Sequence, residues 1–152
     1  MAVDEPNWKV PEWWYREERP PNDDAYFENM YRVIFQSGLN WRVIEDKWLT
    51  TKKTLANFEV SKVAYFSDVE VENLMKDAGI VRNKGKIKAI IQNAQNFKAI
   101  EKQYGSFQKY LDSLDKSDNY ANVVKDLVNK FKWLGQPSAS LFLYTVGEKI
   151  NP

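Results

Sequence analysis

Two absences limit the chemistry that this chain can perform. The 152 residues contain no cysteine and no histidine. Ser-His-Asp and Cys-His nucleophilic catalysis, thiolate metal sites and histidine-ligated metals are therefore excluded. Catalysis by carboxylate, lysine or tyrosine side chains, catalysis through a cofactor, and a purely binding role remain.

The densest cluster of one charge lies between residues 76 and 88. It holds one acid, Asp77, and these bases: Lys76, Arg82, Lys84, Lys86 and Lys88. Gly79 and Gly85 allow the backbone to approach a ligand closely. A helix that begins near Asn83 presents free backbone N–H groups and the positive end of its dipole. The spacing predicts a helix-hairpin-helix element that holds a DNA backbone without reading its sequence.

We expect the DNA-phosphate contacts to come from one set of hairpin residues: Gly79, Val81, Arg82, Lys84, Gly85 and Lys86. The alternative is an ordinary helical corner whose lysines form a solvated face. The net charge of the whole chain is only +1, so a local basic spot favours an anion site over nonspecific polycation behaviour.

Helical periodicity runs through almost the whole chain and predicts an all-α fold in a single domain. The predicted helices span residues 22–37, 41–55, 60–65, 68–78, 84–104, 106–114, 120–134 and 138–146, with a loop at 115–119. Residues 22–152 are expected to form the helical domain, with the helix-hairpin-helix near 68–104. Residues 1–21 are expected to form an aromatic-rich segment that packs on this domain, through Trp8, Trp13, Trp14 and Tyr15.

The start of the chain lacks a basic region followed by an apolar stretch, so we expect no secretory signal. No window is apolar and long enough to span a membrane. We therefore expect a cytoplasmic, DNA-associated monomer with no membrane contact.

Three blocks of the sequence resemble one known family. They are residues 26–41 (YFENMYRVIFQSGLNW), 69–94 (VEVENLMKDAGIVRNKGKIKAIIQNA) and 131–147 (FKWLGQPSASLFLYTVG). In order and separation they resemble the DNA-3-methyladenine glycosylase I family, within the helix-hairpin-helix superfamily. The resemblance implies a glycosylase-like helical bundle that acts in base-excision repair. Its substrate would be double-stranded DNA with an alkylated purine, whose N-glycosidic bond is hydrolysed after the base is flipped out.

The resemblance also places a base pocket. Trp41 matches the family's motif tryptophan, which would stack on the extruded, cationic base. Tyr15 falls near the position of a pocket tyrosine. Val33 stands where the family has a pocket glutamate, and Gln36 is the nearest amide one helical turn along. The base-binding set is therefore Trp41, Tyr15, Gln36 and Val33, with Glu17 and Gln36 as candidates for the unknown catalytic group. The alternative for Trp41 is a plain core residue.

The family's structural zinc, held by two cysteines and two histidines near the termini, has no counterpart here. Pro6 and Arg16 stand near two of the ligand positions, and the chain ends soon after Gly147, where the other two would lie. We therefore expect a zinc-less member with no cofactor, whose termini are held by the packing of Trp8, Trp13 and Trp14.

Two other classes of function compete with a monofunctional glycosylase. A noncatalytic helix-hairpin-helix protein would bind DNA or a damaged base, and the loss of the glutamate at Val33 favours it. A helical interaction domain would have no contact with nucleic acid. A lyase would need a catalytic lysine, for which Lys84 or Lys86 is available, but phosphate contact explains both more simply.

Overall fold

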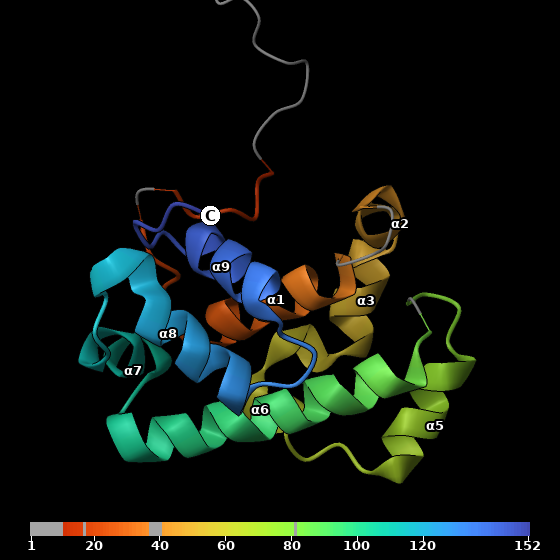
Figure 1. Cartoon of the computed structure of the whole chain (residues 1–152). Helices are drawn as coiled ribbons and strands as arrows, with labels where there is room; N and C mark the ends of the chain where they lie inside the picture. Colours follow the sequence, from red (N-terminus) through yellow and green to blue (C-terminus); the bar gives the residue numbers. More distant parts are fainter. Residues whose placement is uncertain (1–10, 17, 37–40, 81) are drawn as a thin grey trace, which may run out of the picture.

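The computed structural model describes residues 11–16, 18–36, 41–80 and 82–152, and these form a helical bundle (Figure 1). The helices are α1 (Asp23–Gln36), α2 (Trp41–Asp46), α3 (Trp48–Thr54), η1 (Ala56–Phe58), α4 (Val60–Val63), α5 (Asp68–Lys76), α6 (Lys84–Tyr104), α7 (Phe107–Ser113), α8 (Ser117–Lys130) and α9 (Gln136–Thr145). In the described ranges the only extended pairing is an isolated bridge between Tyr15 and Val146. The predicted all-α class is confirmed.

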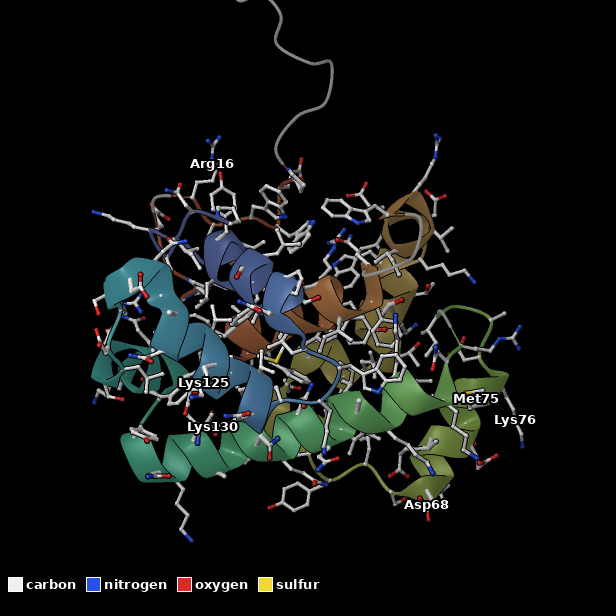
Figure 2. The ribbon with its side chains drawn as sticks, in the orientation of Figure 1. Arg16, Asp68, Met75, Lys76, Lys125 and Lys130 are labelled. Carbon is white, nitrogen blue, oxygen red and sulfur yellow. The ribbon has the colours of Figure 1, made fainter. Side chains whose placement is uncertain are left out.

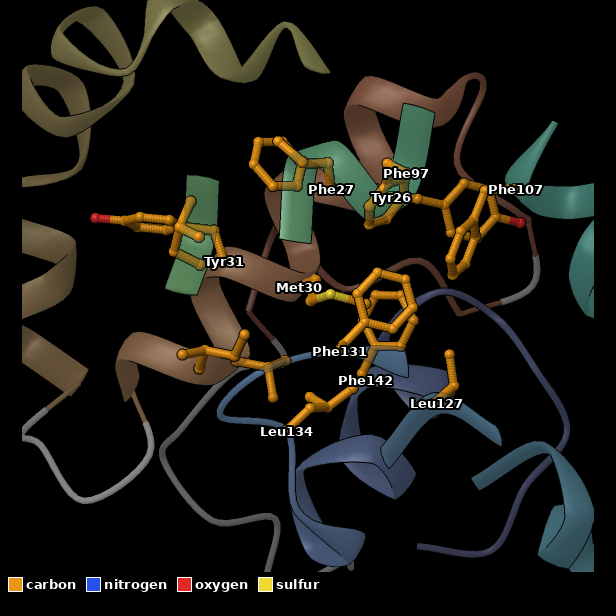
Figure 3. Close-up of a cluster of buried hydrophobic side chains, with 14 of the residues drawn as sticks. Tyr26, Phe27, Met30, Tyr31, Phe97, Phe107, Leu127, Phe131, Leu134 and Phe142 are labelled. Atoms are coloured by element: carbon orange, nitrogen blue, oxygen red, sulfur yellow. The ribbon is translucent and has the colours of Figure 1, made fainter. Parts of the chain in front are cut away.

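Helix α1 lies in the middle of the bundle and packs against α6, α7 and α9. Its apolar face enters a core rich in aromatic rings (Figure 3). Phe97 from α6 stacks on Phe107 from α7 with 4.5 Å between centroids, and Phe107 also lies near Phe142 from α9. Burial of these large rings stabilises the fold.

Side-chain caps fix the ends of several helices where the sequence predicts them. Ser67 and Glu70 form a reciprocal capping box at α5. Asn83 accepts a hydrogen bond from the Lys86 N–H at 3.0 Å, and Ser106 accepts one from the Lys109 N–H at 3.1 Å. The starts of α5, α6 and α7 are therefore confirmed by local chemistry.

Several predicted element boundaries are wrong. The helix predicted over residues 120–134 ends at Lys130, and Phe131 is extended. The single helix predicted over residues 41–55 is two helices, α2 and α3, which are separated at Lys47. The helix predicted to reach residue 78 ends at Lys76, because Asp77 is extended and its side chain accepts from the Gly79 N–H at 2.7 Å. At the start of α8, residues 118–120 have positive φ, so the right-handed helix begins only after the predicted loop.

Residues 11–16 and 18–20 lie against α1 and α9 at the end of the bundle that also holds the C-terminal residues (Figure 1). The Tyr15 N–H donates to the Thr145 carbonyl at 2.7 Å. The buried Asn29 amide donates to the Trp13 carbonyl at 3.1 Å. Gly147 has a φ of 85° and lies so close to the Glu18 carbonyl that a Cβ there would collide with it. Trp8 lies outside the described residues, and the domain division at residue 21 stays a prediction.

Four charged side chains join this segment to α7, α8 and the C-terminal residues. Arg19 makes a bidentate pair with Asp112, at 3.0 Å for both bonds, and a third contact with Glu148 at 3.0 Å. Lys116 contacts both acids at 2.8 Å. Because Arg19 and then Lys116 donate to Asp112, the pKa of its carboxyl is lowered. We call Arg19, Asp112, Lys116 and Glu148 the charge cluster.

Candidate functional site

The hairpin between α5 and α6 is braced by α3, and its first helix ends at Lys76, earlier than predicted. Ile80 is buried and anchors the turn in the core. Thr50 donates to the Gly79 carbonyl, and Lys47 donates to the Ala78 carbonyl at 2.9 Å. A Cβ at Gly79 would lie 2.9 Å from the Asp77 Oδ1 and 3.0 Å from the Thr50 Cβ, so the glycine is required for this packing. Contacts from Lys47 and Thr50 therefore hold the part of the hairpin around Ala78 and Gly79, which we call the platform.

Part of the predicted phosphate set lies on the solvent side of this platform. Arg82, Lys84 and Gly85 are exposed at the start of α6, and Lys84 forms an ion pair with Glu72 at 3.1 Å. Lys76 projects from the hairpin end of α5, while Lys125 and Lys130 lie on α8, away from the hairpin (Figure 2). Val81 lies outside the described residues. Phosphate binding by this set stays a prediction.

Lys86 requires a correction to the predicted set. Its side chain is buried, and its ammonium donates to the Ile34 carbonyl at 3.2 Å in the last turn of α1. The ammonium also lies 5.6 Å from the ring centroids of Phe35 and of Trp133. Burial lowers the pKa of Lys86. Lys86 therefore joins α6 to the C-terminal end of α1, where a cation suits the helix dipole, and does not project toward solvent.

Trp41 is the first residue of α2 and is 40% exposed. Its ring lies 6.5 Å from Trp13 and 6.3 Å from Trp14, between centroids. Trp14 also meets Tyr144 of α9 edge-to-face at 5.6 Å. We call Trp13, Trp14, Trp41 and Tyr144 the aromatic cluster. Its accessible ring at Trp41 is a surface on which a planar base can stack.

Val33 and Gln36 lie on α1 and are both buried. Val33 fills its position with apolar atoms, so it provides no carboxylate. Neither the amide oxygen nor the amide nitrogen of Gln36 has a hydrogen-bond partner among the described residues. The indole N–H groups of Trp13 and Trp14 are likewise buried and without a partner there. Unpaired buried polar atoms are costly and uncommon, so each needs an explanation.

Tyr15 is half-buried beside Trp14, and its backbone is fixed by the bridge to Val146. Burial and, to a smaller extent, the Glu28 carboxylate raise the pKa of its phenol, so the hydroxyl stays protonated at neutral pH. Glu17 lies outside the described residues. The Trp41 ring thus lies near Trp14, and Tyr15 is the residue that follows Trp14 in the chain.

A cavity that the sequence analysis missed lies on the other side of Trp13. It has a volume of about 620 Å³ and is lined by Pro11, Glu12, Trp13, Glu28, Arg32, Glu45 and Trp48. The Arg32 guanidinium lies 4.1 Å from the Trp48 ring and 5.0 Å from the Trp13 ring, and pairs with Glu45 at 3.3 Å. The signal was available in the sequence, since Arg32 interrupts an otherwise apolar stretch of α1. Arg32 fixes Trp13 against α1 and α3.

The donor groups at the joined termini do not fit a zinc ion. No group of three or more metal-ligating side chains occurs in the described parts of the chain, and the sequence has no cysteine or histidine. The charge cluster occupies the junction, and two of its four members are cations that cannot bind a metal. We therefore assign no step to zinc.

The described residues form an all-helical domain with a braced helix-hairpin-helix, and this is the architecture of a helix-hairpin-helix DNA glycosylase such as 3-methyladenine DNA glycosylase I. The sequence profile of the methyladenine glycosylase family matches residues 11–136, and the chain belongs to this family.

Relatives and solved structures agree with this assignment. The chain is 31% identical over 111 residues to DNA-3-methyladenine glycosylase 1 of Escherichia coli, covering 73% of this chain and 55% of the relative. It is 27% identical over 101 residues to the Haemophilus influenzae glycosylase, covering 66% and 55%. It thus spans about half the length of these curated relatives. A structure of the Staphylococcus aureus 3-methyladenine DNA glycosylase I superposes with a TM-score of 0.75 at 28% identity, covering 88% of this chain and 80% of that one.

Proposed function

We propose that this protein is a monofunctional DNA glycosylase that releases alkylated purines of the 3-methyladenine type. In this proposal the hairpin holds the backbone of double-stranded DNA, and the damaged nucleotide is flipped toward the aromatic cluster. A cationic alkylpurine is already a good leaving group, so the protein needs mainly to extrude, stack and desolvate it. We infer that it does so as a cytoplasmic monomer.

One observation carries this proposal beyond family membership. Gln36 and Trp41 stand at the two ends of the connection from α1 to α2, and each has an unused capacity for binding. Trp41 presents an accessible ring, and Gln36 presents a buried amide with no partner in the described residues. Both groups suit a purine chemically, because its face stacks on an indole and its edge offers hydrogen-bond donors and acceptors.

The charge cluster supports the inference that the protein works without zinc. Glu148 is nearly inaccessible and receives Arg19 at 3.0 Å and Lys116 at 2.8 Å. Tyr120 donates a further hydrogen bond to Glu148 at 3.1 Å. These contacts join residues 11–20 to the C-terminal residues, which is the role that the resemblance gives to zinc.

The test is release of free base from methylated duplex DNA, resolved by chromatography into 3-methyladenine, 7-methylguanine and 3-methylguanine. Heat-treated protein is the blank. We expect release above the blank, with 3-methyladenine in excess. Absence of all three products, in protein shown to be folded and to bind DNA, would refute the glycosylase.

A second function is favoured by Val33. The Val33 side chain is 2% exposed, and it places apolar atoms where the family has a glutamate. A binding protein for DNA or for damaged bases would need the hairpin and Trp41 but no carboxylate there. Salt-dependent DNA binding without base release would identify this function.

A further inference from the structure

Trp133 lies in the loop that connects α8 to α9 and is unusual in two ways. Its side chain is 55% exposed, although tryptophan is usually well covered. Its φ is 61°, in the left-handed region that a bulky residue rarely adopts. Such strain is stable only where the surroundings enforce it, and it is enriched at functional sites.

The surroundings of Trp133 do enforce this conformation. Phe131 and Leu134 are buried on either side of it. Asn93 of α6 pairs with both main-chain groups of Lys132, donating to the carbonyl at 3.1 Å and accepting from the N–H at 2.8 Å. Asn96 donates to the Lys130 carbonyl at 2.6 Å. The loop is therefore fixed to α6, and the tryptophan is held outward.

The ring of Trp133 lies beside the first turn of α6. An ideal Cβ at Gly85 would be 3.4 Å from the Trp133 Cζ2, so the ring borders the helix end that the hairpin presents. The Lys86 ammonium lies 5.6 Å from the centroid of the Trp133 ring and 5.6 Å from the centroid of the Phe35 ring of α1. Lys86 thus positions the ring between the hairpin and the end of α1, which leads toward Trp41.

We propose that Trp133 is a DNA-contacting residue whose open face packs on a deoxyribose or base next to the phosphate held by the hairpin. This inference rests on the proposed DNA-binding function. Duplex DNA is the occupant that the charges favour, because both elements that border the ring carry exposed bases: Arg82 and Lys84 at the start of α6, and Lys132 next to Trp133 in the loop. Aromatic packing on nucleic acid adds affinity without adding a phosphate contact.

The experiment measures binding of the full chain to a duplex that contains a tetrahydrofuran abasic analogue, over a range of salt concentrations. Trp133→Gly should weaken binding about five- to 100-fold, with the salt slope unchanged because no charge is lost. Glycine accepts the positive φ without strain, so the variant should unfold at no lower temperature than wild type. Trp133→Phe should restore most of the affinity. Tyr65→Ala, which removes a 79% exposed ring outside the hairpin, is the matched control and should bind as wild type does.

Each other outcome overturns the inference. Folded Trp133→Gly that binds the duplex as wild type does would show that the ring touches no DNA. Failure of Trp133→Phe to restore binding would show that the loss came from the loop. If wild type does not bind the duplex, and the double variant Arg82→Ala, Lys84→Ala behaves as wild type does, then both the proposed DNA-binding function and the inference about Trp133 fail.

Discussion

Gln36 shows how a single residue separates stability from function. A buried amide with two unpaired atoms lowers the free energy of unfolding, because both atoms have lost their water. Methionine has a similar shape and no polar atom that needs a partner. The residue is therefore expected to be kept for a ligand and not for the fold.

Gln36→Met should raise the free energy of unfolding by about 1–2 kcal/mol and reduce base release. Urea unfolding and the chromatographic assay measure the two effects. Gln95→Met is the control at an exposed position where the amide does have a partner, the Ala64 carbonyl at 3.2 Å, so this change should not raise stability. A stabilised Gln36→Met with full activity would exclude Gln36 from the base site.

Trp41→Ala should slow base release about 10- to 100-fold, because the variant loses the stacking surface for the extruded base. Binding to undamaged duplex should stay close to that of wild type, since that duplex has no extruded base. Leu49→Ala on α3 removes another exposed apolar side chain and should leave both properties unchanged. Unchanged release in Trp41→Ala would contradict the pocket assignment.

At the scale of elements, the hairpin combines rigid support with a small number of free charges. Thr50 of α3 and Lys47 just before it hold the hairpin backbone. Lys86 is buried, whereas Arg82 and Lys84 are exposed at the start of α6. Glu72 pairs with Lys84 and weakens its attraction for an anion. Removal of the positive charges should therefore weaken DNA binding, and removal of the negative charge of Glu72 should strengthen it.

Arg82→Ala with Lys84→Ala should reduce the slope of log K against log salt by about 1.8, the value for two lost phosphate contacts. Glu72→Gln should strengthen binding. Lys125→Ala, on α8 and away from the hairpin, is the control and should leave the slope unchanged (Figure 2). If the double variant, Glu72→Gln and Lys125→Ala all changed DNA binding equally, the DNA would bind at a surface other than the hairpin.

The junction of α1, α6 and α7 predicts a dependence of stability on pH. Burial, and then the nearby Glu101 carboxyl, raise the pKa of Asp23 from 3.8 to about 6 in the folded protein. The folded state therefore binds this proton more tightly than the unfolded state. The stability contributed by the protonated carboxyl is present below pH 4 and is lost as pH rises through about 6.

Asp23→Asn should remove this dependence while keeping the acceptor for the Phe107 N–H, which lies 3.0 Å from the Asp23 Oδ1. The variant's melting temperature should exceed that of wild type by an amount that grows between pH 4 and pH 7 and is small at pH 4. Asp46→Asn, on the exposed end of α2, controls for a general charge effect. A difference that is constant with pH would contradict the raised pKa of Asp23.

At the scale of the whole molecule, the charge cluster holds the two ends of the described chain together. Glu148 is 4% exposed at its side chain, and it contacts Arg19 and Lys116. Removal of one partner from a buried carboxylate leaves charge that is only partly compensated. The cluster is therefore more important for stability than an exposed ion pair.

Arg19→Met should lower the free energy of unfolding by about 2 kcal/mol and the melting temperature by about 4–8 °C. Lys62→Met breaks an exposed pair with Glu59 at 2.9 Å and should have little effect. Incubation with a chelator should leave the melting temperature of wild type unchanged. A chelator-dependent loss would show that a metal holds the fold.

The sequence by itself determines the all-α class and the capped starts of α5, α6 and α7. Ser67, Asn83 and Ser106 act on backbone groups within three residues, so local chemistry is sufficient to place them. The family resemblance likewise depends on short motifs that can be read along the chain. The predicted pocket residues stay predictions, because no bound base marks their contacts.

Only the tertiary structure decides which groups the ends of long side chains contact. Lys86 looks like a phosphate ligand in the sequence, yet its ammonium meets the Ile34 carbonyl, 52 positions away. Trp133 becomes noticeable only when its φ and its contact with Gly85 are known. Arg32, Arg19 and Glu148 likewise find their partners across helices. Burial, pairing and strain depend on packing between distant segments, and a linear pattern does not encode that packing in a readable form.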